Sequence, residues 1–225
     1  MEDQYLRSFG RLKGRPIKPR QAALLESLLP HLELPAGALD LQALFSGALL
    51  VMEIGFGAGE HLVAQASARP DAGFIGVEPF LNGVASCLRH IEAAGVSNVR
   101  LRQGDAREVL AQLPAAALDQ VFILFPDPWP KARHWKRRLI QPGFIAELAR
   151  ALKPGGEVRF ATDWAPYAEW TLALFLQSPS FRWLAERAGD WRQPWPGHQP
   201  TRYEQKKLGD CAPVFLQFER AAAAR

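Results

Sequence analysis

The sequence has few of the features that mark secreted, metal-binding or membrane-spanning proteins. Its 225 residues include only two cysteines, Cys87 and Cys211, which lack metal-ligand spacing and any disulfide framework. We therefore expect buried, inert thiols and no metal ion. No apolar run reaches the roughly 18 residues of a membrane-spanning helix, and no apolar signal-peptide core follows the first charges. These absences predict a soluble, cytoplasmic protein without a membrane partner.

The hydrophobic content of 48% is enough for one sizeable core. We expect a single domain over residues 1–225, with a basic N-terminal arm at 1–21 and a short disordered tail at 221–225. Short apolar runs alternate with amphipathic stretches, a pattern typical of βαβ units around a mostly parallel sheet. The predicted strands are five runs bounded by glycine, proline or aspartate: Leu49–Ile54, Phe74–Glu78, Val99–Arg102, Gln120–Phe125 and Val158–Thr162.

Local signals predict three further elements. A leucine-rich helix at Ala22–Leu29 should end at Pro30. A second helix at Phe144–Leu152 should stop in a tight turn at Lys153–Gly156. The alternation in Val214–Phe218 predicts a half-buried strand.

The net charge of +4 is modest, but the cations are concentrated in two clusters. The first cluster comprises Arg7, Arg11, Lys13, Arg15, Lys18 and Arg20. The second comprises Lys131, Arg133, Lys136, Arg137 and Arg138. A polyanionic partner would explain both clusters. For the first cluster, a solvated surface is the simpler alternative.

A glycine-rich turn follows the first predicted strand. The strand ends in Glu53 and Ile54, and the glycines that follow are Gly55, Gly57 and Gly59. Alternating glycines let a ligand lie against the main chain. The spacing G-x-G-x-G differs from the dinucleotide-binding G-x-G-x-x-G, which argues against NAD. An acidic Glu53 would repel a pyrophosphate, but it suits the cationic methionine end of S-adenosylmethionine. A purely structural turn is the alternative.

Two more carboxylates lie where the next strands end. Glu78 closes the second strand and could accept both ribose hydroxyls of a nucleoside. Asp105 follows the third strand and could accept the adenine amino group or cap the next helix. Together with Glu53, these residues would line the carboxyl edge of a parallel sheet. The sequence therefore predicts an S-adenosylmethionine site at this edge.

The fourth strand leads into a loop with three prolines within five residues, Pro126–Pro130. So many prolines would hold Asp127 and Trp129 in a preset geometry beside the cofactor. Residues 131–138 then interleave cations with an aromatic ring, as phosphate contact and base stacking would require. We expect no metal site at His134, since no second His, Cys or carboxylate stands at ligand spacing.

These motifs make the family recognisable. The strings Pro126–Arg138, Ala161–Asp163 and Thr201–Glu204 resemble the signature set of the bacterial tRNA (guanine-N7)-methyltransferases. The strings Arg7–Phe9 and Gly14–Gln21 are similar to the basic arm of that family, and the resemblance runs from about residue 7 to about residue 220. It implies a Rossmann-like class I methyltransferase fold, with a mostly parallel seven-stranded sheet and helices on both faces. The implied reaction is methyl transfer from S-adenosyl-L-methionine to N7 of guanine-46 in the variable loop of tRNA.

The resemblance also implies a role for each matching residue. The cofactor would be bound by Glu53, Gly55, Gly57, Gly59, Glu78, Asp105 and Asp127, of which Asp127 would also be catalytic. The target nucleoside would be contacted by Lys131, Asp163, Thr201, Arg202, Tyr203 and Glu204. The RNA would be contacted by Arg133, His134, Trp135, Lys136, Arg137 and Arg138.

Two other functions compete with this interpretation. The Asp127-Pro128-Trp129 string faintly resembles the motif of exocyclic-amine methyltransferases. A catalytically idle RNA-binding module on the same fold would also explain the basic segments. The sequence leaves open whether the protein is a monomer or a homodimer.

Overall fold

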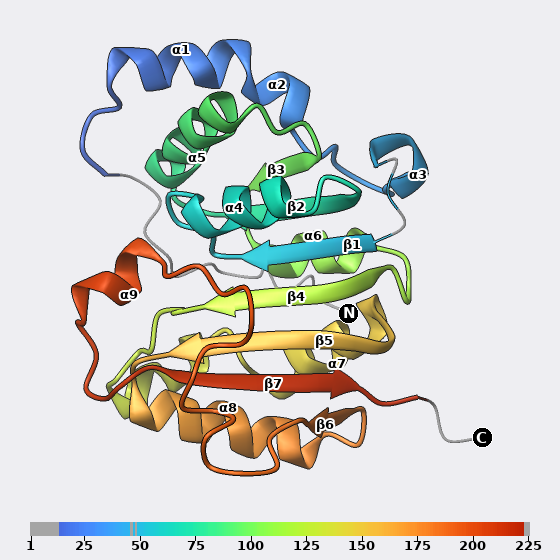
Figure 1. Cartoon of the computed structure of the whole chain (residues 1–225), viewed down its shortest axis with the longest axis vertical. Coiled ribbons are helices and arrows are strands. Elements are labelled where there is room, and N and C mark those ends of the chain that lie inside the picture. The colour runs from blue at the N-terminus through green and yellow to red at the C-terminus, as the bar shows by residue number, and fades with distance from the viewer. Residues whose placement is uncertain (1–13, 46, 48, 223–225) are drawn as a thin grey trace.

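The computed structural model describes residues 14–45, 47 and 49–222. A seven-stranded sheet forms its centre, with helices on both faces (Figure 1). The strands are β1 (Leu49–Ile54), β2 (Ala72–Glu78), β3 (Val99–Gln103), β4 (Leu118–Leu124), β5 (Leu152–Thr162), β6 (Phe181–Trp183) and β7 (Val214–Arg220). The helices are α1 (Pro19–Ser27), α2 (Leu29–Leu32), α3 (Leu41–Leu44), α4 (Glu60–Ala68), α5 (Leu81–Ala94), α6 (Ala106–Gln112), the 3-10 helix η1 (Ala132–Arg137), α7 (Pro142–Ala151), α8 (Ala165–Gln177) and α9 (Arg202–Lys206).

The strand order β3-β2-β1-β4-β5-β7-β6 confirms the predicted fold class. Strands β1 to β5 run parallel, and β7 inserts antiparallel between β5 and β6. Each of the five predicted core strands is present, as is the predicted strand at the C-terminal end. Their ends differ by a few residues from the predicted ones, most of all in β5, which begins at Leu152.

Three local predictions are wrong. The segment Lys153–Gly156 is not a turn that follows a helix, because α7 passes directly into β5 and these residues form an irregularity in its pairing with β4. Pro30 does not end a helix but lies in the first turn of α2, where its missing amide hydrogen costs nothing. The basic arm does not extend to residue 21, since α1 begins at Pro19.

The two ends of the chain are described only in part. Arg7, Arg11 and Lys13 of the first basic cluster lie outside the described residues, as do residues 223–225 of the predicted tail. Within the described part, Arg20 is exposed and pairs with Glu92 at 2.7 Å. Among the described residues, no helix is long and apolar enough to cross a membrane.

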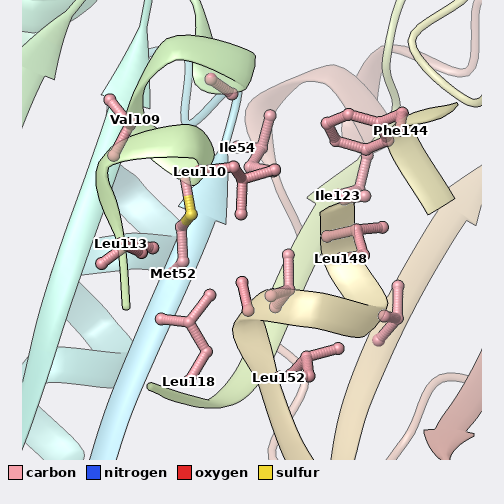
Figure 2. Packing of buried hydrophobic residues seen from close by; sticks show 14 of the residues in the cluster. Met52, Ile54, Val109, Leu110, Leu113, Leu118, Ile123, Phe144, Leu148 and Leu152 are labelled. Carbon is pink, nitrogen blue, oxygen red and sulfur yellow. The ribbon is translucent and has the colours of Figure 1, made fainter. Parts of the chain in front are cut away.

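Side chains alternate between the two faces of the sheet and build a core on each. On one face, Met52, Ile54 and Ile123 pack against α6 and α7 (Figure 2). On the other face, Val51 and Phe122 pack with residues of α4 and α5. Because β1 is buried on both faces, its sequence is an apolar run with one interruption, Glu53.

The parallel strands place their carboxyl ends at one edge of the sheet, the edge toward which β1, β4 and β5 point in Figure 1. Strand β7 runs the opposite way, so Val214 at its start pairs with Thr162 at the end of β5. The segment that precedes β7, including α9, therefore reaches the same edge as the loops that follow β1 to β5. This topology brings Tyr203 next to Phe125, and Gly209 and Cys211 next to Asp163.

Candidate active site

The glycine-rich turn after β1 adopts the backbone geometry that its sequence predicts. Gly55, Gly57 and Gly59 all have positive φ angles, of 74°, 58° and 85°. A Cβ atom at Gly55 or Gly57 would meet nothing within 4 Å, whereas one at Gly59 would clash with Cys87. The first two glycines therefore leave an open backbone surface, and the third permits close packing of α4 on α5.

Glu78 at the end of β2 holds this turn. Its Oε2 accepts a hydrogen bond of 2.8 Å from the Gly57 amide, and its Oε1 accepts one of 2.9 Å from the Phe80 amide. Burial raises the pKa of Glu78 above its ordinary value, the two amides oppose this shift, and the charges of Asp127 and Glu53 add to it. The carboxylate is thus fixed beside the exposed backbone of Gly57, where a ribose could reach it.

Glu53 lies deeper than Glu78 and has a partner that the sequence analysis missed. Its Oε2 lies 2.7 Å from Nδ1 of His61 in the first turn of α4, and the two side chains are 3% and 1% exposed. The sequence contains a weak signal for this pair, since His61 stands two residues after the last glycine of the turn. The His61 contact compensates part of the cost of burying the carboxylate.

Asp105 caps α6, which was one of its two predicted roles. Its Oδ1 accepts hydrogen bonds of 2.9 Å from both the backbone amide and Nε of Arg107. Burial alone would raise the pKa of Asp105, but the bonds from Arg107 outweigh burial and lower it. An adenine amino group would have to share a carboxylate that is already bound by an arginine.

The proline-rich loop after β4 is strained on both sides of Asp127. Phe125 and Trp129 have positive φ angles of 51° and 44°, which cost about 1–2 kcal/mol for a residue with a side chain. Strained backbone of this kind persists only where the surrounding structure fixes it, and it is concentrated at functional sites. Partial desolvation by the loop raises the pKa of Asp127, although the side chain still reaches solvent.

Arg138 was predicted to contact RNA, and this prediction is wrong. The residue is only 2% exposed. Its Nε donates to the Pro128 carbonyl at 2.9 Å, and a terminal nitrogen donates to the Pro166 carbonyl at 3.3 Å. The guanidinium also lies 5.0–5.2 Å from the ring centroids of Trp135, Tyr167 and Trp170. Arg138 thus ties the Asp127 loop to the start of α8.

The other members of the basic run are accessible. Lys131, Arg133 and Lys136 are exposed on and beside η1. Arg137 lies with its guanidinium 5.0 Å from the ring of Trp129, and His134 meets the same ring edge-on at 5.8 Å. Trp135 is 39% exposed. Lys131, Arg133 and Lys136 thus lie exposed near the exposed ring of Trp135, and contact of this surface with RNA stays a prediction.

Asp163 follows β5 and is buried at 5% exposure. Its Oδ2 has no hydrogen-bond partner among the described residues. Gly209 packs so closely on Asp163 that any side chain there would clash, and the Cys211 amide donates to the Asp163 carbonyl at 3.1 Å. The sequence analysis missed this contact of Gly209. An unpaired buried carboxylate oxygen needs a donor, which a substrate could provide.

Tyr203 joins this group of residues. Its ring lies 5.7 Å from that of Phe125. Burial raises the pKa of Tyr203, and the charges of Asp163 and Asp127 raise it further. The tyrosine is 37% exposed, so it forms an accessible aromatic wall close to both carboxylates.

The segment Thr201–Glu204 forms the N-terminus of α9. Thr201 and Glu204 make a capping box, and Oε2 of Glu204 also lies 2.8 Å from Nε2 of His198. Glu204 therefore faces His198. Arg202 is exposed and lies 3.6 Å from Glu60.

The expectation of two buried thiols holds for only one of them. Cys87 is buried against Gly59, and burial raises its pKa. Cys211 is partly exposed. The described residues contain no group of three or more potential metal ligands.

Comparison with known proteins identifies the family. A family model described as "Putative methyltransferase" matches residues 47–215. A tRNA (guanine-N(7)-)-methyltransferase of Caulobacter sp. (strain K31) is 58% identical over 216 residues, covering 96% of this chain and 95% of that protein. A protein of the same name from Nitrobacter hamburgensis is 53% identical, covering 96% of this chain and 87% of its own length.

The chain belongs to the tRNA (guanine-N(7)-)-methyltransferase family. Solved structures of more distant methyltransferases share its fold. The antibiotic-resistance methyltransferase Kmr has a TM-score of 0.55 at 19% identity, covering 82% of this chain and 93% of that one.

The geometry of the edge fits the methyl donor of such a family. Gly55 and Gly57 present bare backbone, where a Cβ would project into open space. Glu78 is fixed beside them with its charge available to hydroxyl donors. Glu53 lies near the end of β1, beside β2, and its negative charge suits the ammonium group of the methionine part of the cofactor.

The position of Glu78 leads to a prediction about cofactor binding. Glu78→Ala should weaken S-adenosylmethionine binding, because each charge-assisted hydrogen bond to the ribose contributes roughly 1.5–3 kcal/mol. Calorimetric titration measures the change. Glu169→Ala, on the exposed side of α8, is the matched control and should leave affinity unchanged. Affinity of Glu78→Ala within about twofold of wild type, with an unchanged melting temperature, would exclude Glu78 from the site.

Proposed function

We propose that this protein transfers the methyl group of S-adenosyl-L-methionine to N7 of guanine-46 in the variable loop of tRNA. The observation that carries the proposal is the shared carboxyl edge. The glycine turn and Glu78 lie at the ends of β1 and β2, and Asp127 and Asp163 follow the neighbouring strands β4 and β5. A methyl donor bound at the ends of β1 and β2 would lie beside a guanine bound at the ends of β4 and β5. The identity to named relatives supports the choice of substrate.

The residues on the β1–β2 side would bind the donor. Glu78 would accept the ribose hydroxyls, and Glu53 would lie near the methionine ammonium. Asp105 would approach the adenine, sharing its carboxylate with Arg107. When bound, S-adenosylmethionine supplies an electrophilic methyl group on a sulfonium.

The residues on the β4–β5 side would position the guanine. The accessible face of Tyr203, beside Phe125, offers a stacking surface for a base. The unpaired oxygen of Asp163 can accept a hydrogen bond from the N1 or N2 group of guanine. Adenine lacks this pair of donors, so Asp163 would also contribute to base selection.

The chemistry requires alignment more than proton transfer. Guanine N7 already carries a free lone pair, so its attack on the methyl carbon needs no general base. The sulfur–carbon bond breaks as the nitrogen–carbon bond forms, and positive charge moves onto the purine ring. Asp127, held between two strained residues, would stabilise that charge electrostatically.

The RNA would lie along the exposed basic run. Lys131, Arg133, Lys136 and Arg137 would contact phosphates, and Trp135 would offer a stacking surface. The basic arm would extend the same footprint within a single-domain enzyme. We expect the protein to act in the cytoplasm, where tRNA is found.

The proposed reaction predicts a specific product. With labelled S-adenosylmethionine and an unmodified tRNA transcript, nucleoside analysis should yield 7-methylguanosine, and a transcript with adenine at position 46 should stay unlabelled. Asp127→Asn should lower turnover at least about tenfold, equivalent to about 1.4 kcal/mol, while the protein still binds the cofactor.

Other products would identify the competing functions. An alkali-stable methylated amine would favour the exocyclic-amine reaction. A protein that binds tRNA but no S-adenosylmethionine would be an RNA-binding module. Equal losses of cofactor affinity and turnover in Asp127→Asn would make Asp127 a cofactor ligand only.

The burial of Arg138 predicts that the basic run has two distinct roles. Replacing Lys131, Arg133 and Lys136 together with alanine should reduce the log–log salt slope of tRNA binding by roughly 2 to 2.7 units, at about 0.7–0.9 per phosphate contact. Arg138→Gln should leave that slope nearly unchanged but lower turnover, because it loosens the Asp127 loop. Filter binding at several salt concentrations measures the slopes. A slope lost in Arg138→Gln and kept in the triple variant would reverse these roles.

A further inference from the structure

Two buried histidines, His61 and His198, each contact a carboxylate, and the two carboxylates lie on different sides of the site. His61 places Nδ1 2.7 Å from Oε2 of Glu53, on the side of the proposed methyl donor. His198, in the connection before α9, places Nε2 2.8 Å from Oε2 of Glu204, at the segment proposed for the guanine. The side chains of the two histidines are 1% and 3% exposed.

The two histidine rings lie close together in an aromatic enclosure. Their centroids are 6.0 Å apart. Phe122 meets His61 at 4.8 Å, and Trp195 and Phe215 meet His198 at 5.4 and 5.2 Å. Because these rings exclude bulk water, each polar atom inside needs a protein group or an ordered water as its partner.

One nitrogen of each ring has no such partner among the described residues. These atoms are Nε2 of His61 and Nδ1 of His198. A ring that carries one proton and donates it to its carboxylate leaves its second nitrogen as an acceptor. Two acceptors cannot bond to each other, but a single water can donate one hydrogen to each. Nitrogens bridged in this way lie roughly 4.5–5 Å apart, a spacing that two rings with centroids 6.0 Å apart can provide when these nitrogens face each other.

We propose that one ordered water joins His61 to His198, so that a continuous hydrogen-bonded chain runs from Glu53 to Glu204. His61 and His198 are then positioning residues that hold the two carboxylates in a fixed relation. The assignment of Glu53 to the methyl donor, and of the segment Thr201–Glu204 to the guanine through Tyr203, rests on the proposed function. The chain gives the two ligands a physical route for energetic coupling, so a change at one end alters affinity at the other.

Other contacts anchor the same segment to α4. Nε2 of Gln65 donates to the Gly197 carbonyl at 2.9 Å, and Arg202 lies 3.6 Å from Glu60. The connection before α9 is therefore attached to the helix that follows the glycine turn. The histidine pair is the buried part of this attachment and the part that reaches both carboxylates.

His198→Gln separates the proposed bridge from the bond to Glu204. Its side-chain amide can replace the Nε2 donor, but the acceptor at Nδ1 is lost. We expect S-adenosylmethionine affinity to fall about fivefold or more, although His198 contacts no residue proposed to touch the cofactor. His31→Gln, exposed on α2, is the control and should bind like wild type. Affinity of His198→Gln within about twofold of wild type would overturn the coupling.

A double-variant cycle tests whether the histidines act as one unit. His61→Phe combined with His198→Gln should bind the cofactor no more than about twofold more weakly than His61→Phe alone. If the losses of cofactor affinity in the two single variants multiply in the double variant, the pairs Glu53–His61 and His198–Glu204 are independent. That result would overturn the proposed chain. Melting temperatures exclude loss of folding as the cause.

Nitrogen-15 spectra of histidine-labelled protein test the chain without any ligand. The protein has five histidines, so single variants assign each signal. We expect His61 in its Nδ1–H form, and a shift of its Nε2 resonance in His198→Gln. An unchanged Nε2 resonance would overturn the bridge. Wild-type protein that fails to bind S-adenosylmethionine would instead contradict the proposed function, and the spectra would still decide the chain.

Discussion

The site depends on the common direction of five neighbouring strands. Because β1 to β5 are parallel, every loop that follows one of them leaves from the same edge of the sheet. Groups as distant in sequence as Gly55 and Asp163 therefore lie at the same edge of the sheet. The antiparallel strand β7 adds the C-terminal segment, because pairing of Val214 with Thr162 returns the chain to that edge. The family's fold and the location of its chemistry therefore follow from one constraint.

The distribution of charge follows the same geometry. The chain is basic overall, yet its edge gathers Glu53, Glu78, Asp127 and Asp163, two of them with raised pKa values. Burial of carboxylates is costly, and here the cost is offset by the Gly57 and Phe80 amides and by His61. Negative charge inside suits a cationic methyl donor and a purine that becomes cationic. The cations of η1 remain outside, where an RNA backbone can reach them.

Sequence reasoning located the strands and the glycine turn because each depends on local signals, apolar runs and positive φ angles. The sequence did not predict the contacts of residues whose partners come from distant segments of the chain. Arg138 stands in a run of exposed cations, and only the packing of Tyr167 and Trp170 shows that it is buried. His198 has no local signal at all, since its neighbours Phe215 and His61 come from distant segments. Pro30 was misplaced because proline ends one helix and begins another equally well.

In the proposed function, the methyl donor binds at the carboxyl edge of the sheet. A hollow with a volume of about 340 Å³ lies at the opposite ends of the strands, where Lys153 pairs with Asp119 and Arg159 with Glu157. A crystal structure with S-adenosylhomocysteine would show which end of the strands holds the cofactor. We predict that the ribose hydroxyls bond to Glu78 and that the ligand lies over Gly55 and Gly57. A ligand bound beside Lys153, with Glu78 still bonded only to its two amides, would mean that the carboxyl edge is not the cofactor site.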